Sequence, residues 1–182
     1  MTSSIATPDD VLSCWREAGP DRWFTRDEAF DLAIRERFLP TYEAAARGEL
    51  STWEATAEGA LALVIVLDQF PRNMFRGDAR TYAADGLARA CANRALKRGY
   101  DLDVPEELRG FLFLPFMHSE ELNDQNRCVE LYRAAKDANL PHAERHREII
   151  RRFGRFPHRN TVLGRGTTPE EQAYLDADGF KG

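Results

Sequence analysis

A run of eight apolar residues, residues 60–67, constrains the fold of this chain more than any other feature of its sequence. A helix formed by this run has no polar face, and a helix that is apolar all round has to be buried on every side. The rest of the chain must therefore supply elements that surround it. We predict a central buried helix at this position.

Signals for the surrounding elements are helical from one end of the chain to the other. A Ser or Thr followed by proline or by acidic residues, the pattern that opens helices, occurs at residues 7–10, 25–28, 51–54 and 168–171. Further helices are predicted from Asp85 to Gly99, from Pro105, from about Ser119 to Asn139 and from Pro141. Apolar residues do not alternate with period two, so strands are not expected. We predict an all-α fold of antiparallel helical hairpins in a single domain over residues 1–182.

Composition narrows the class of protein. With 43% hydrophobic and 30% charged residues, the chain has the profile of a soluble globular protein. The net charge of -5 argues against a general nucleic-acid binder, and no apolar run approaches the ~20 residues that span a membrane. Residues 1–5 lack the basic and apolar segments of a signal peptide. The three cysteines are far apart and fit a reducing compartment. We expect a cytoplasmic protein.

Polar residues directly follow the central apolar run. Asp68 would lie near the negative end of a helix dipole and close to the core, so it needs a cationic partner. The candidates are Arg72, Arg155 and Arg159, because a guanidinium can hold a carboxylate with two hydrogen bonds. Such a pair would be either part of a functional site or a purely structural link between two loops.

A second apolar run, residues 111–117, contains Pro115, which should bend or break a helix. It is followed by His118, Ser119 and Glu120. An imidazole beside a carboxylate can act as a general acid or base. The same polar groups could instead cap a helix boundary.

A third polar segment ends the last long helix. His146 shares a helical face with Ile149, Ile150 and Phe153, and Gly154 is placed to end that helix. The following loop carries, among others, Arg155, His158, Arg159 and Asn160, side chains that bind anions or move protons. His146 is either a packed core histidine or a member of this site.

Metal binding has little support in the sequence. His118, His142, His146, Glu120 and Asp68 include the ligand types of a two-histidine, one-carboxylate site. Only His142 and His146 have helical ligand spacing, and a metal site requires a full set of ligands in the right geometry. We predict no metal and no cofactor.

Three blocks carry a family resemblance: LDQFPRN (residues 67–73), LPFMHSE (114–120) and RFGRFPHRN (152–160). They resemble the signature blocks of an uncharacterised bacterial family catalogued as "domain of unknown function 924", and the likeness continues through residues 163–165 and 168–171 to cover nearly the whole chain. The resemblance implies a tetratricopeptide-like α/α superhelix. It implies no activity.

Within the chain, the first and third blocks each place Phe-Pro, and then Arg-Asn, just beyond an apolar helix. In a repeat of hairpins such loops would lie on one side of the stack, and the alternative is that the match is a coincidence. Since each block brings groups that need partners to a helix end, we predict that Asp68, His118 and Arg159 converge in one site.

Three classes of function remain open. In the first, a pocket binds a small anionic ligand, either as a binding protein or as an enzyme that converts this ligand. The candidates are His118, His146, His158, Asp68 and Glu120 for catalysis, and Arg72, Asn73, Arg155, Arg159 and Asn160 for ligand binding. In the second class, a tetratricopeptide-like stack binds a peptide or protein partner. In the third, the arginines hold RNA phosphates.

Overall fold

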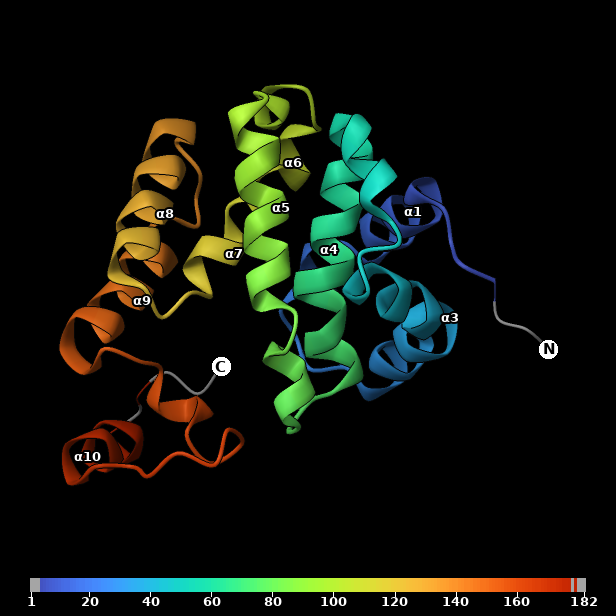
Figure 1. Ribbon diagram of the computed structural model, residues 1–182. Coiled ribbons are helices and arrows are strands. Elements are labelled where there is room, and N and C mark those ends of the chain that lie inside the picture. Colours follow the sequence, from blue (N-terminus) through green and yellow to red (C-terminus); the bar gives the residue numbers. More distant parts are fainter. Residues whose placement is uncertain (1–3, 178, 180–182) are drawn as a thin grey trace. The chain divides into compact units, whose positions relative to one another are not determined.

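The computed structural model describes residues 4–177 and 179, so the signal-peptide prediction falls largely outside the described residues. Within them every regular element is a helix and no strand occurs (Figure 1), which confirms the all-α prediction. None of the described helices is long and apolar enough to cross a membrane. The α-helices are α1 (Pro8–Ala18), α2 (Pro20–Trp23), α3 (Glu28–Ala46), α4 (Ala57–Met74), α5 (Asp85–Lys97), α6 (Glu106–Arg109), α7 (Leu114–Met117), α8 (Leu122–Ala135), α9 (Leu140–Phe153) and α10 (Pro169–Asp176).

Short 3-10 helices lie between these elements. They are η1 (Ser51–Ala55), η2 (Ala79–Tyr82), η3 (Tyr100–Leu102), η4 (Gly110–Leu112) and η5 (Pro157–Arg159). The chain divides into two compact units, Met1–Pro115 and Phe116–Gly182, and the division falls within α7. The prediction of a single domain stays a prediction.

The first unit is built around α4. Every residue of this helix from Gly59 to Pro71 is buried, as the apolar run predicts. Helices α1, α3 and α5 pack against it (Figure 1). The Trp15 ring anchors α1 to this core, with its centroid 5.8 Å from that of Phe70 and 5.5 Å from that of Phe111, both in edge-on geometry.

Two predicted helix starts are wrong by a few residues. Helix α3 is capped by Asp27 and not by Thr25, because the Asp27 carboxylate accepts hydrogen bonds from the backbone N–H groups of Ala29 and Phe30, both at 3.1 Å. Residues 51–54 form part of η1, and Thr56 caps α4 by accepting from Gly59 N–H at 3.1 Å.

The other two predicted starts are confirmed at Thr7 and Thr168, each of which forms a capping box with an acidic residue three positions later.

The first family block lies inside α4 and not beyond it, contrary to our prediction. Pro71 belongs to the last turns of a helix that continues to Met74. Pro71 has no N–H, so one backbone hydrogen bond of the helix is missing. Its carbonyl still accepts a hydrogen bond from Phe75 N–H at 3.0 Å, and the helix continues past the proline. The third block ends α9 and enters η5, so the two Phe-Pro segments are not equivalent loops.

The second unit consists of α8, α9 and α10 with the segments that connect them. Helices α8 and α9 pack on each other and are joined by residues 136–139. Helix α9 ends at Gly154, whose φ of 69° is in the left-handed region that glycine favours. Helix α8 is shorter than predicted at both ends. The Ser119 hydroxyl accepts Glu121 N–H at 3.1 Å before the helix begins, and Lys136 adopts a left-handed C-cap where it ends.

Candidate functional site

In the first unit, Asp68 finds its cationic partner on its own helix. The Asp68 side chain is fully buried, and Nη1 of Arg72 lies 3.5 Å from its Oδ1. The same guanidinium grips Asp85 with two hydrogen bonds, of 3.0 and 3.2 Å. Among the three predicted partners, Arg72 is therefore confirmed. The pair ties the end of α4 to the start of α5.

Asn73 has a structural contact in the same unit. Its Nδ2 donates to Oδ1 of Asp31 at 2.7 Å, and Nε of Arg76 donates to the other oxygen of that carboxylate at 2.6 Å. These bonds join the end of α4 to the first turn of α3. The role of Asn73 in ligand binding stays a prediction.

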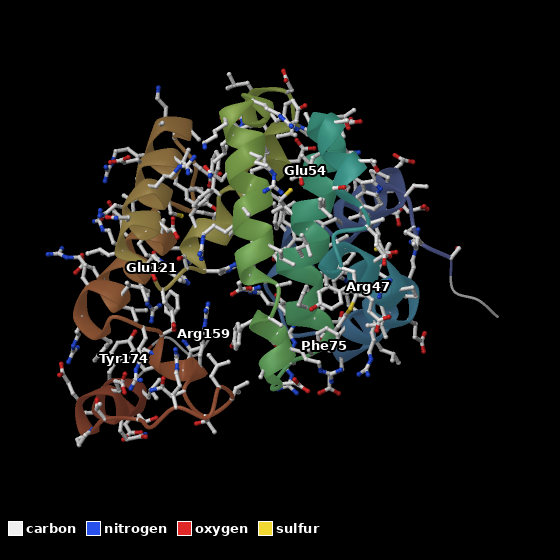
Figure 2. All side chains as sticks on the ribbon, in the orientation of Figure 1. Arg47, Glu54, Phe75, Glu121, Arg159 and Tyr174 are labelled. Carbon is white, nitrogen blue, oxygen red and sulfur yellow. The ribbon has the colours of Figure 1, made fainter. Side chains whose placement is uncertain are left out.

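In the second unit, several predicted site residues gather around one aromatic ring. Phe156 is fully buried, and the guanidinium carbon of Arg159 lies 4.5 Å from its ring centroid, within cation–π range. The imidazole centroids of His146 and His158 each lie 5.6 Å from the same ring. Arg159 comes from η5 (Figure 2) and His146 from α9. We call His118, His146, Phe156, His158 and Arg159 the Phe156 cluster.

The ring of His146 has a defined tautomer. Its Nδ1 lies 2.7 Å from the carbonyl oxygen of His142. Since a carbonyl can only accept, Nδ1 carries the proton and donates, and Nε2 of the neutral ring carries a lone pair. Burial lowers the pKa of His146 to about 4, and the nearby charges of His118 and Arg159 act in the same direction. His146 is therefore neutral at physiological pH.

His158 has a similar environment. Burial lowers its pKa to about 3, and the positive charge of Arg159 is the next largest cause. His118 contributes to the lowered pKa of both other histidines, which places it in the same electrostatic neighbourhood. Burial, with a smaller contribution from the charge of Arg159, thus keeps the imidazoles of His146 and His158 uncharged at neutral pH.

Gln125 fixes the turn that carries His118. Its side chain is fully buried, and Nε2 donates to the carbonyls of Met117 and Ser119, both at 2.7 Å. These two carbonyls flank His118 in sequence, so one amide from α8 orients the backbone on both sides of that histidine. Sequence reasoning missed Gln125, because nothing in its own surroundings marks it as different from a surface glutamine of a helix.

Glu120 holds the backbone of the cluster's central residue. Its Oε1 accepts Phe156 N–H at 2.8 Å, and Arg165 grips the carboxylate with bonds of 2.7 and 3.1 Å. Arg165 also donates to the Phe156 carbonyl at 3.1 Å. Burial acts to raise the pKa of Glu120, but the hydrogen bonds from Arg165 and Phe156 outweigh it and hold that pKa below its ordinary value. Glu120 therefore anchors Phe156 as a carboxylate.

Sequence reasoning also left Arg165 out of the site. Its signal was its place in the segment that extends the family resemblance, next to Gly164.

Arg155 and Asn160 bind the last helix of the chain. Nε and Nη2 of Arg155 lie 2.6 and 2.9 Å from the two oxygens of Glu171, and Nδ2 of Asn160 lies 3.1 Å from Oε2. The hydrogen bond from Arg155 is the main cause that lowers the pKa of Glu171 to about 2. Glu171 was predicted only as a helix cap, and it also accepts Thr168 N–H at 2.8 Å. These contacts fasten α10 to the loop after α9.

The structure thus sorts the predicted residues into two groups. Asp68, Arg72 and Asn73 belong to the first unit. The second unit brings together His118, Glu120, His146, Arg155, His158, Arg159 and Asn160. Convergence of the two groups in one site stays a prediction. Among residues 4–177 and 179, no group of three or more His, Cys, Asp or Glu side chains is arranged to hold a metal ion.

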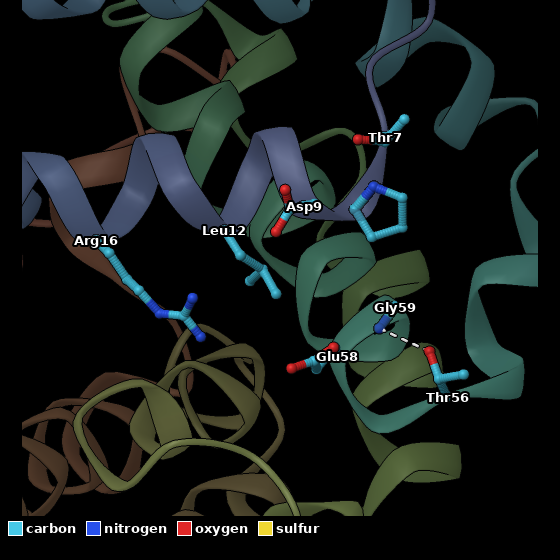
Figure 3. A pocket seen from close by; sticks show the side chains of 8 residues that line it. Thr7, Asp9, Leu12, Arg16, Thr56, Glu58 and Gly59 are labelled. Carbon is cyan, nitrogen blue, oxygen red and sulfur yellow. Dashed lines mark hydrogen bonds between the residues drawn. The ribbon is translucent and has the colours of Figure 1, made fainter.

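A pocket of about 240 Å³ in the first unit has none of the predicted site residues in its lining (Figure 3). It is formed where α1 and α4 begin. Its lining consists of Thr7, Pro8, Asp9, Leu12, Arg16, Thr56, Glu58 and Gly59.

The fold and the cluster together define an all-α protein with a cluster of arginine and histidine side chains around Phe156 in its C-terminal unit. More particularly, the chain belongs to the family described as "Bacterial protein of unknown function (DUF924)", whose model matches residues 11–179. This confirms the family resemblance seen in the sequence. The chain is also similar to a protein of unknown function from Agrobacterium tumefaciens, with 50% identity, a TM-score of 0.91, and coverage of 93% of this chain and 97% of that one. No curated protein matches the chain significantly.

Proposed function

We propose that the Phe156 cluster binds a small anion, a phosphate or a carboxylate, with Arg159 as its charged contact. The observation that carries this proposal is the position of Arg159, a residue only 6% exposed, whose guanidinium lies over the buried Phe156 ring that the neutral imidazoles of His146 and His158 also contact. The planar fork of arginine matches two oxygens of one anion at once.

Three arginines of the second unit have contacts that bear on this site. Arg155 binds Glu171 and Arg165 binds Glu120, each with two hydrogen bonds. The positive charge of Arg159 reaches the imidazoles, where it adds to the effect of burial and lowers the pKa of His146 and of His158. A positive potential in a poorly hydrated place favours an anion more than the same charge on the surface would.

Rigidity of the loop supports the same proposal. The N–H of Phe156 is held by Glu120 and its carbonyl by Arg165. Pro157 fixes the backbone at the next position. A loop that is ordered before binding loses little conformational entropy on binding, so more of the contact free energy appears as affinity.

The histidines favour binding over turnover. A general base works best when its pKa lies near the working pH. With pKa values of about 4 and about 3, His146 and His158 are weak bases at neutral pH. His118 and Asp68 keep their place as catalytic candidates. We therefore propose a ligand-binding site. Catalysis at this site would need a further group, such as His118.

The test is the effect of anions on the melting temperature at constant ionic strength. Phosphate or a small carboxylate should raise the melting temperature of the wild type above its value in chloride. Arg159→Lys keeps the charge but removes the fork, so the variant should stay folded and lose this rise. Arg151→Lys is the matched control, because Arg151 is an exposed residue of α9 that pairs with Glu148 at 3.0 Å.

Two results would contradict the proposal. One is a wild type whose melting temperature rises no further in phosphate or carboxylate than in chloride. The other is an Arg159→Lys variant that keeps the full rise, since the fork would then have no part in binding.

The alternative functions have less support. The tetratricopeptide-like superhelix, with a groove for a peptide, would suit the packing of α3 on α4 and of α8 on α9. The exposed large apolar side chains of the described residues, however, each come from a different segment: Ile5, Phe24, Leu32, Leu87, Leu102, Leu122 and Leu163. RNA binding would need a basic surface, which a net charge of -5 does not favour. We therefore propose the anion site first.

A further inference from the structure

The pocket between α1 and α4 carries charges of both signs. Asp9 and Glu58 contribute carboxylates, and Arg16 contributes a guanidinium (Figure 3). In the part of the chain that the structure describes, none of these three side chains forms an ion pair. The next residue of α1, Asp10, by comparison, has Arg37 at 3.2 Å. The pocket therefore presents three charges that the protein itself does not neutralise.

Two of these charges, on Asp9 and Arg16, lie on either side of Leu12 along α1. Asp9 and Arg16 are seven positions apart on α1, which places them on one face and about 10 Å apart along the helix axis. Leu12 lies between them and is 3% exposed. Glu58 extends toward the same space from the first turn of α4 (Figure 3). The positions of Asp9 and Arg16 are thus about two helical turns apart, a spacing that a ligand with a charged group at each end can bridge.

The backbone around the pocket is fixed. The capping box of Thr7 sets the start of α1, and Ala6 N–H donates to Oγ1 of Thr41 at 2.9 Å just before it. At the start of α4, a side chain on Gly59 would put its Cβ 2.1 Å from the carbonyl oxygen of Trp53, so this wall tolerates only glycine. A volume of about 240 Å³ corresponds to roughly eight waters at ~30 Å³ each. This is room for a ligand of amino-acid size.

We propose that this pocket binds a small zwitterion of the amino-acid class, with its ammonium group at Asp9 and Glu58, its carboxylate at Arg16 and its carbon chain on Leu12. A guanidinium pairs with a carboxylate through two parallel hydrogen bonds, and two carboxylates together suit an ammonium with its three donors. A ligand with only one charged group loses one of these contacts and leaves the other end of the pocket unmatched. None of these residues belongs to the Phe156 cluster, so the proposal is independent of the anion site.

Three six-carbon compounds test this proposal in the full chain: 6-aminohexanoate, hexanoate and hexylamine, with binding measured by calorimetry. The zwitterion should bind about two- to fivefold more tightly than either singly charged compound, since an ion pair with an exposed side chain such as these contributes about that factor in affinity. Arg16→Gln should remove the preference over hexylamine, and Glu58→Gln should weaken the preference over hexanoate. Glu17→Gln is the control, because Glu17 is exposed on α1 but does not line the pocket.

Equal affinity for hexylamine and 6-aminohexanoate would overturn the proposal in favour of a plain cation site. The proposal would also fail if none of the three compounds bound, or if Glu17→Gln lost as much affinity as Arg16→Gln. Because Glu58 belongs to the first turn of α4, circular dichroism should accompany its variant. If Glu58→Gln loses helix, Arg16→Gln near the end of α1 decides the result alone.

Discussion

At the scale of single residues, the contacts around Phe156 divide the polar side chains by task. Glu120 and Arg165 hold the backbone of Phe156, and Arg155 holds Glu171. Arg159 instead lies on the aromatic ring. Substitutions in the first set should therefore act on stability, whereas Arg159→Lys should act on anion binding. The clearest single-residue prediction, however, concerns a glycine of the first unit.

Gly59→Ala should destabilise the protein although alanine is the better helix former. Its Cβ would lie 2.1 Å from the Trp53 carbonyl oxygen, and relieving such an overlap in a packed region costs about 1–3 kcal/mol. Gly86→Ala is the matched control, since Gly86 is in α5 with no atom within 4 Å of its added Cβ. That variant should gain up to ~1 kcal/mol. Urea unfolding of both variants measures the difference, and a Gly59→Ala variant as stable as Gly86→Ala would refute the argument.

At the scale of elements, α10 is a short helix whose place depends on one carboxylate. Helix α10 has 8 residues, too few to be stable alone in water. Glu171 is its one buried residue, and it caps the helix as well as binding Arg155 and Asn160. Local packing adds the contact of Phe153 with Tyr174, whose ring centroids are 5.0 Å apart. The hydrogen bonds of Glu171 are therefore the main attachment of α10.

Glu171→Gln should loosen α10 and leave the rest of the second unit folded. The charged hydrogen bonds that it weakens contribute about 2 kcal/mol. Glu170→Gln is the matched control: Glu170 is an exposed neighbour paired with Arg152 at 3.1 Å, and its loss should cost at most ~0.5 kcal/mol. Hydrogen exchange of the amides of α10 is the measurement. Equal protection of α10 in both variants would show that Glu171 is not its main attachment.

The attachment of α10 should also depend on pH. The folded-state pKa of Glu171 is lowered to about 2 from its ordinary value of 4.5. A carboxylate with a lowered pKa contributes stability that is present above its unfolded pKa and is lost as the pH falls through its folded pKa. Protection of α10 should thus fall between pH 4.5 and 2, and less steeply in Glu171→Gln.

At the scale of the whole molecule, His146 and His158 make the free energy of unfolding depend on pH in the acid range. The folded-state pKa values of His146 and His158 are about 4 and about 3, both below the ordinary value of 6.5. Between pH 6.5 and these folded-state pKa values, the histidines of the unfolded chain take up protons that those of the folded chain do not. Stability is therefore undiminished above pH 6.5 and is lost as the pH falls toward 4, before most carboxylates titrate.

His158→Asn and His146→Asn should each make the free energy of unfolding less dependent on pH in this window. One such histidine contributes a slope of up to ~1.4 kcal/mol per pH unit. Urea unfolding at several pH values between 7.5 and 4.5 gives the slope for each variant. Above pH 7 the variants and the wild type should share the same flat dependence, which serves as the control. An unchanged slope between pH 6.5 and 4.5 would mean that neither imidazole is buried in its neutral form.

The sequence by itself determined the helical class, the burial of α4, the helix starts at Thr7 and Thr168, the end of α9 at Gly154 and the family. These features depend on local chemistry: the period of apolar residues, the side chain of a cap and the φ angle of a glycine. Sequence reasoning also named most residues of the Phe156 cluster, because unusual polar groups beside apolar helices are visible in a single chain.

Only the tertiary structure decided which of these groups meet. It placed Arg72 on Asp68, Arg155 on Glu171 and Arg165 on Glu120, pairings that depend on side-chain directions across packed elements. It also moved the starts of α3 and α4 to Asp27 and Thr56, where each side chain reaches the N–H groups of the first turn. The physical reason is the same in each case. Which of several nearby partners a charged group or a donor pairs with depends on differences of an ångström or two in the donor–acceptor distance. The packing of the helices sets these distances.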